Sequence, residues 1–251
     1  GFIGLGNVGG KLAGSLLRNK YDLTVIDLDS SLTKDFVAKG ASASNSPKEL
    51  AQKVDLIITC LPSPKICAEV MEGNDGVIAG ISKNKIWLEM STTDESEIKR
   101  LGKLVKERDA IPLDGPVSGG CHRAATGNIS IFVGGERNAF EKILPALTVM
   151  GRKVLHTGEL GSATVLKVIT NYLASTHLVA LGEAWTVAKK SNLAVFLSPT
   201  ARLWFFSLLI SSKLLYKTSN SSAVLGGFFL ALAIIGTNEV AMLIIDFIIA
   251  M

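Results

Sequence analysis

The sequence predicts an α/β fold built on a doubly wound, mostly parallel sheet, and three observations carry this prediction. Short apolar runs alternate with amphipathic stretches over the first 156 residues, a glycine-rich turn opens the chain, and a long proline-free segment follows near 158–190. Strands that alternate with helices favour a parallel sheet covered on both faces. The proline-free segment predicts one long helix.

Each predicted strand is an apolar run bounded by polar or turn residues. Between the strands, stretches such as 95–109 carry apolar residues at helical spacing. Ser46 followed by Pro47 marks a helix start, because serine caps a helix and proline suits its first turn. The strands are expected at residues 2–4, 23–28, 54–61, 85–90, 110–114, 128–135 and 153–158.

Composition narrows the class of protein. With 251 residues, 48% of them apolar, the chain can bury a sizeable core, and a net charge of +4 without a basic cluster argues against nucleic acid as a partner. Three scattered cysteines and three scattered histidines fit neither a metal site nor a disulfide framework, so we expect no metal, reduced thiols and a cytoplasmic location. No signal peptide is visible, and because "GFIGLG" opens inside a strand, we expect the first residues of that strand to be missing.

The opening turn, "GLGNVG", has the G-x-G-x-x-G spacing. Gly4 permits a tight turn, Gly6 lets the backbone approach a pyrophosphate, and Gly9 lets helix and strand pack closely. Asp27 lies near the end of the next strand, 21 residues after Gly6, where an acid can bind the ribose hydroxyls of NAD and repel the 2′-phosphate of NADP. The motif therefore indicates NAD, although a glycine-rich turn that binds no nucleotide is the alternative.

Three later loops follow predicted strands and carry candidate ligand groups. "TCLPSP" at 59–64 is stiffened by its prolines, and "EMSTTD" at 89–94 offers hydroxyl groups either to a nicotinamide ribose or to a helix cap. "DGPVSGG" at 114–120 exposes backbone N–H groups beside Ser118, and such a cluster suits a carboxylate. An ordinary strand-to-helix turn is the alternative for the first of these loops, a helix cap for the second and a glycine-rich turn for the third.

Lys167 is the one charged residue in the apolar run "GSATVLKVITNYLASTHLVAL". Thr164, Lys167, Asn171 and Ser175 fall on one helix face, because positions three and four apart are neighbours. A desolvated lysine has a lowered pKa and exchanges protons near neutral pH. The alternative is a lysine that reaches solvent beside a structural asparagine.

Four stretches, "FIGLGNVGGKLAGSLL", "TCLPSP", "DGPVSGG" and "GELGSATVLKVITN", together resemble the β-hydroxyacid dehydrogenase family (3-hydroxyisobutyrate dehydrogenase-like) over residues 1 to about 193. The resemblance implies a Rossmann domain at 1–157, an interdomain helix at 158–190 and an all-helical C-terminal region at 191–251. It also implies homo-oligomeric assembly, and hydride transfer between a short 3-hydroxy acid and nicotinamide.

The resemblance assigns roles position by position. Lys167 is implied as the general acid and base, and Asn171 as the residue that orients the substrate. The substrate carboxylate is implied to bind Ser118, Gly119 and Gly120. The implied cofactor-binding residues are Gly4, Leu5, Gly6, Asn7, Val8, Gly9, Asp27, Leu61, Pro62, Ile66 and Thr92.

The segment after residue 191 departs from the family pattern. It holds only five of the 48 charged residues and lacks the Lys-Asp pair that the family carries on a later helix. Three explanations stay open: a transmembrane anchor, a divergent helical domain, and a reading-frame shift near 193. A membrane span needs roughly 20 apolar residues, and the apolar run 223–236 is shorter than that. We favour the reading-frame shift. A catalytically silent NAD-binding protein is accordingly the alternative function.

Overall fold

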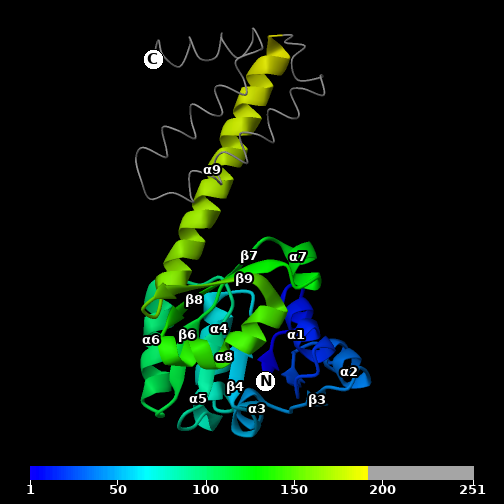
Figure 1. Ribbon diagram of the computed structural model, residues 1–251, viewed down its shortest axis with the longest axis vertical. Helices are drawn as coiled ribbons and strands as arrows, with labels where there is room; N and C mark the ends of the chain where they lie inside the picture. Colours follow the sequence, from blue (N-terminus) through cyan, green and yellow to red (C-terminus); the bar gives the residue numbers. More distant parts are fainter. Residues whose placement is uncertain (192–251) are drawn as a thin grey trace. The chain divides into compact units, whose positions relative to one another are not determined.

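The computed structural model describes residues 1–191, in which strands and helices alternate as the sequence predicts (Figure 1). The elements are β1 (Phe2–Ile3), α1 (Gly9–Arg18), β2 (Thr24–Ile26), α2 (Ser30–Ala38), β3 (Ser42–Ala43), α3 (Pro47–Lys53), β4 (Leu56–Thr59), α4 (Pro64–Glu72), α5 (Val77–Gly80), β5 (Ile86–Glu89), α6 (Glu95–Lys106), β6 (Ile111–Asp114), β7 (Val117–Ser118), α7 (Cys121–Ala125), β8 (Ile129–Gly135), α8 (Arg137–Met150), β9 (Gly151–Gly158) and α9 (Ser162–Lys190).

The strands form one sheet in the order β3-β2-β1-β4-β5-β6-β8-β7, and β9 pairs with β8. All pairings among β1 to β6 are parallel, whereas β8 runs antiparallel to β6 and β7. The order 3-2-1-4-5-6 is that of a Rossmann fold, so the predicted fold class is confirmed. The chain reverses its direction across the sheet between β1 and β4, and ligands of such sheets bind at this point, outside the carboxyl ends of the strands.

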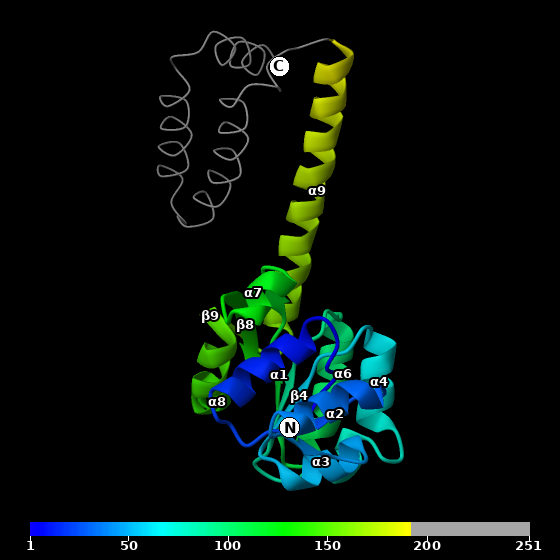
Figure 2. The ribbon, with the colours of Figure 1, turned by 90° about the vertical axis from the view of Figure 1, so that its right-hand side faces the viewer.

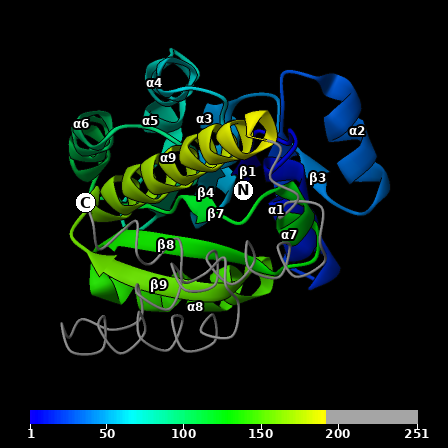
Figure 3. The same cartoon turned by 90° about the horizontal axis from the view of Figure 1, so that it is seen from above.

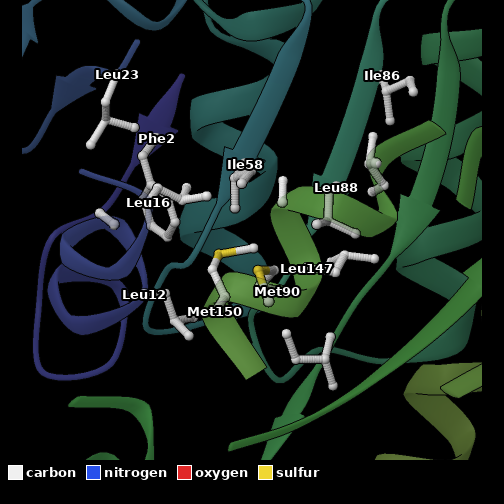
Figure 4. Packing of buried hydrophobic residues seen from close by; sticks show 14 of the residues in the cluster. Phe2, Leu12, Leu16, Leu23, Ile58, Ile86, Leu88, Met90, Leu147 and Met150 are labelled. Carbon is white, nitrogen blue, oxygen red and sulfur yellow. The ribbon is translucent and has the colours of Figure 1, made fainter. Parts of the chain in front are cut away.

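Apolar side chains cover both faces of the sheet, because successive strand residues point to opposite sides. On one face, Phe2, Ile58 and Leu88 pack in a cluster with residues of α1 and α8, including Leu12 and Leu147 (Figure 4). Helices α3 to α6 contribute to the cluster on the other face. Figure 2 shows α1 beside α8, and Figure 3 shows α4 and α5 across the sheet from α8.

Side-chain caps fix several helix starts. The Ser46 hydroxyl accepts a hydrogen bond from the Glu49 N–H at 3.1 Å and precedes Pro47, as predicted. Asp94 caps α6 by accepting from the Glu97 N–H at 2.8 Å. Each such cap stabilises a helix by roughly 1 kcal/mol.

Helix α9 begins at Ser162 rather than near 158, because β9 stays paired with β8 as far as Gly158 and a turn follows. The chain divides into two units, Gly1–Ser175 and Thr176–Met251, and α9 contributes residues to both. The predictions for 192–251, including the missing Lys-Asp pair, lie outside the described residues. Among residues 1–191, no helix has both the length and the apolar character that a membrane span requires.

Candidate functional site

The glycine loop joins β1 to α1 at the carboxyl edge of the sheet. Gly4 has φ +94°, and a side chain there would overlap the carbonyl oxygen of Cys60. A Cβ at Gly9 would overlap the carbonyl oxygen of Gly4, so both glycines are required for strand, turn and helix to fit together. A Cβ at Gly6 would meet no atom within 4 Å. Gly6 therefore borders open space, as expected where a pyrophosphate approaches the backbone.

The N-terminus of α1 faces this space without a side-chain cap. Val8 occupies the N-cap position and makes no side-chain hydrogen bond to the helix. The N–H groups of Gly10 and Lys11 donate to the carbonyl oxygens of Gly6 and Val8 at 2.9 and 3.0 Å, and the helix dipole places partial positive charge at this end. Together with the open backbone at Gly6, this arrangement fits a dinucleotide phosphate.

Asp27 lies directly after β2 and is tied to the glycine loop. One carboxylate oxygen accepts a hydrogen bond from the Leu5 N–H at 2.6 Å, and the other accepts from the Asp29 N–H at 2.8 Å. These bonds hold the negative charge beside the phosphate cradle, where the sequence predicts the adenine ribose. Leu28 is fully exposed next to it.

Glu89, at the end of β5, connects the two loops that carry the remaining cofactor candidates. Its carboxylate is wholly buried and accepts hydrogen bonds from Thr59 Oγ1 at 2.5 Å, Cys67 Sγ at 2.7 Å and the Ser91 N–H at 2.7 Å. Ser91 Oγ in turn accepts from the Leu61 N–H at 2.7 Å. Loops 59–64 and 89–94 are thereby held against each other.

Burial sets the protonation of the acid and thiols in this network. Desolvation raises the pKa of Glu89, although its three donors act in the opposite direction. Desolvation also raises the pKa of Cys67, and it raises the pKa of Cys60 to about 12. These two thiols are therefore protonated at neutral pH, which excludes them as nucleophiles in this state.

The hydroxyl groups in loop 89–94 have different surroundings. Ser91 is buried and engaged with Leu61, and Thr93 is buried with an unpartnered hydroxyl group. Asp94 supplies the helix cap, and of the three hydroxyl-bearing residues 91–93 only Thr92 is exposed. Of the other predicted cofactor neighbours, Pro62 is exposed, whereas Leu61 and Ile66, the latter in α4, are half-buried.

The loop "DGPVSGG" leaves β6 and forms β7, which pairs antiparallel with β8. Ser118 is half-buried. Gly119 and Gly120 have φ values of +136° and +84°, a region that strongly favours glycine. Their backbone N–H groups follow that of Ser118 immediately in the chain.

Lys167 lies on α9, three residues after Thr164, and is half-buried. Desolvation lowers the pKa of its amine. Asn171 follows one turn later and is exposed, so helical spacing places both on one face. In the described part of the chain, no hydrogen bond joins Ser118 to Lys167.

Asp114, the last residue of β6, instead connects the substrate loop to α9. It is wholly buried, and its oxygens accept from the Gly161 N–H at 2.8 Å, the Thr164 N–H at 2.7 Å and Thr164 Oγ1 at 2.8 Å. Sequence reasoning quoted Glu89 and Asp114 only as the ends of motifs and gave them no role. The signal available in the sequence was an acidic residue at the end of each apolar run that predicts a strand.

No cluster suited to a metal occurs in the region 1–191.

The sheet order and the glycine cradle define a dinucleotide-binding domain of the Rossmann type. Residues 1–158 match the family described as the NAD binding domain of 6-phosphogluconate dehydrogenase. The chain belongs to the 3-hydroxyisobutyrate dehydrogenase-like family of β-hydroxyacid dehydrogenases, as the sequence resemblance predicts.

Three comparisons show the extent of this similarity. The rat protein named 3-hydroxyisobutyrate dehydrogenase, mitochondrial, is 36% identical over 193 residues, or 77% of this chain, and the match spans 58% of the rat protein. A probable 3-hydroxyisobutyrate dehydrogenase of Dictyostelium discoideum is 31% identical over 92% of this chain and 74% of its own, so that match extends past residue 191. The Mycobacterium tuberculosis 3-hydroxyisobutyrate dehydrogenase, solved with L-serine, superposes with a TM-score of 0.73 at 25% identity, covering 89% of this chain and 72% of its own.

Proposed function

We propose that this chain acts as an NAD-dependent dehydrogenase that transfers hydride between a short 3-hydroxy acid and nicotinamide. The observation that carries the proposal is Lys167, a half-buried amine with a lowered pKa on the helix that follows the Rossmann domain. An amine of this kind suits proton transfer near neutral pH. The substrate class follows the names of the relatives in the same family.

In this proposal, each group of residues has one task. A bound nicotinamide supplies the hydride acceptor or donor. Neutral Lys167 accepts the proton of the substrate hydroxyl during oxidation, and the Lys167 ammonium returns it during reduction. The N–H groups of Gly119 and Gly120, with the Ser118 hydroxyl, bind the substrate carboxylate.

The cofactor-binding residues divide between the two ends of the dinucleotide. Residues 4–9 hold the pyrophosphate, and the Asp27 carboxylate binds the adenine ribose, which favours NAD over NADP. Leu61, Pro62 and Ile66 line the cofactor, and Thr92 contacts its nicotinamide end. Asn171 orients the substrate beside Lys167. The cytoplasmic location and the homo-oligomeric state stay predictions.

Substitution of Lys167 tests the proposal. We expect Lys167→Met to lower kcat by about 10²- to 10⁴-fold for whichever of 3-hydroxyisobutyrate and L-serine is oxidised, because proton transfer from a positioned side chain contributes that much. NADH affinity, measured by fluorescence titration, should stay unchanged. Wild-type kcat for oxidation should rise with pH through the lowered pKa of Lys167, because only the neutral amine accepts a proton.

Lys153→Met is the matched control, because Lys153 is exposed on β9. It should keep wild-type kcat and NADH affinity. NADH binding without lysine-dependent turnover of either acid would contradict the dehydrogenase proposal and support a catalytically silent nucleotide-binding protein.

A further inference from the structure

Helix α9 begins without a capping side chain of its own. Gly161, with φ +94°, precedes its first residue and has no side-chain oxygen to offer the helix. An N-cap side chain normally accepts a hydrogen bond from the second or third N–H of its helix. Here the carboxylate of Asp114, 50 residues earlier in the chain, accepts from the third N–H, that of Thr164.

Asp114 holds the helix start at more than one point. Its Oδ1 accepts from Gly161, and its Oδ2 accepts from both the N–H and the hydroxyl of Thr164. Because the two oxygens engage Gly161 just before the helix and Thr164 within its first turn, the contact fixes both the rotation of α9 and its position along its axis. A capping residue within the helix itself would fix neither relative to the sheet.

The surroundings of Asp114 leave little room for a different arrangement. A Cβ at Gly134 in β8 would overlap Asp114 Oδ1, so strand β8 is shaped around this carboxylate. The Thr157 and Ser162 hydroxyl groups lie 2.7 Å apart and connect the end of β9 to the first residue of α9. The helix start is thus tied to β6 and β9 through polar groups.

The two segments that Asp114 connects are those that the proposed function requires to act together. The chain continues from Asp114 directly into loop 115–120, which contains the candidate carboxylate site at Ser118. Thr164 lies three residues before Lys167, or about 4.5 Å along the helix axis. Any rotation or slip of the helix start is therefore passed to the lysine.

We propose that Asp114 is a positioning residue, which holds α9 in one register against the carboxylate loop and so sets where the Lys167 amine lies. This inference rests on the proposed function for the role of Lys167, but the contacts that carry it are independent of any reaction. A purely structural cap would stabilise α9 and have no further effect on the Lys167 amine.

Two substitutions separate these roles. Asp114→Asn keeps the shape of the side chain but places an NH₂ group, which cannot accept a hydrogen bond, against one of the donors. We expect kcat to fall by about 10²-fold, the size of effect seen when reacting groups are misplaced by about 1 Å. Thr164→Val removes the hydroxyl group, one of the three donors to Asp114, and should lower kcat by a smaller factor. Thr164→Ser keeps a hydroxyl group and should keep kcat near the wild-type value. Ser46→Ala is the control for loss of a cap, because Ser46 caps α3 and not the helix that carries Lys167.

A second readout does not depend on turnover. In the full chain, the pH dependence of Lys167 acylation by acetic anhydride, followed by mass spectrometry, reports the protonation of its amine. In wild type the midpoint should lie below that of an ordinary lysine, because burial lowers the pKa of Lys167. In Asp114→Asn and Thr164→Val the midpoint should move upward, because a displaced helix leaves the amine more hydrated.

The outcomes distinguish the two proposals. If wild type oxidises neither 3-hydroxyisobutyrate nor L-serine, the proposed function fails and the acylation profile still decides the role of Asp114. If Asp114→Asn and Thr164→Val bind NADH normally and keep the wild-type acylation profile, Asp114 does not position Lys167. A lowered melting temperature alone, as expected for Ser46→Ala, would equally overturn the inference.

Discussion

Alanine at Gly6 and at Gly9 should have opposite effects, although both residues belong to one six-residue motif. At Gly9 the new Cβ would overlap the Gly4 carbonyl oxygen, and because that neighbour is backbone, α1 must move away from β1. Overpacking of this kind costs about 1–3 kcal/mol. At roughly 2–4 °C per kcal/mol, the melting temperature of Gly9→Ala should fall by about 2–12 °C.

At Gly6 the Cβ would meet nothing within 4 Å, and the backbone lies outside the left-handed region. Gly6→Ala should therefore fold normally, and the stiffer unfolded chain should stabilise it by about 0.4–1 kcal/mol. The methyl group would instead occupy the space that the proposal gives to the pyrophosphate. We expect the Kd for NADH to rise at least tenfold, which corresponds to about 1.4 kcal/mol.

The assay combines thermal unfolding with fluorescence titration of NADH on the same preparations. Wild-type NADH affinity in Gly6→Ala would refute the placement of the pyrophosphate at this loop. An unchanged melting temperature in Gly9→Ala would refute the steric argument for the close contact between α1 and β1.

Two further substitutions test the acids beside the cofactor loops. Asp27→Asn should lower the ratio of the Kd for NADPH to the Kd for NADH by at least tenfold, which corresponds to about 1.4 kcal/mol. The reason is that the substitution removes the charge that repels the 2′-phosphate. Equal Kd ratios in wild type and variant would contradict this reasoning. Burial raises the pKa of Glu89, so the stability that Glu89 contributes is present at low pH and is lost as pH rises through that raised value. Urea unfolding at pH 5 and pH 8 should thus show Glu89→Gln gaining stability relative to wild type at the higher pH, and a constant difference would refute the reasoning.

The strands of the Rossmann sheet were predictable because they are buried on both faces and appear as continuous apolar runs. In the observed register, residues of these apolar runs pair with one another, as in the parallel pairing of Ile57 with Trp87. Strands β3 and β7 were not predicted, because each has two residues and neither, unlike the equally short β1, is an apolar run. The start of α9 was placed near 158, too early, because a turn that ends at Gly161, with φ +94°, separates the helix from the end of β9 at Gly158.

The glycine loop was predictable for a related reason, since its function depends on spacing within a few residues. The roles of Glu89 and Asp114 depend on partners far along the chain: Thr59 is 30 residues from Glu89, and Gly161 is 47 residues from Asp114. A single sequence places each acid at the end of a strand and says nothing of what it meets there. These contacts became visible only when the strand order was known.

Thr59, Glu89 and Asp114 form one row across the carboxyl edge of β4, β5 and β6, since each is the register partner of the next. The row is wholly buried, and it bonds to loop 89–94 and to the start of α9. Stability alone would favour apolar residues here, because burial of a carboxyl group is costly unless hydrogen bonds compensate for the lost water. The row holds the proposed ligand-binding segments to the sheet before any ligand binds. This lowers the entropic cost of ordering these segments when a ligand binds. Under the proposed function, this positioning role accounts for the burial of two carboxyl groups at this edge.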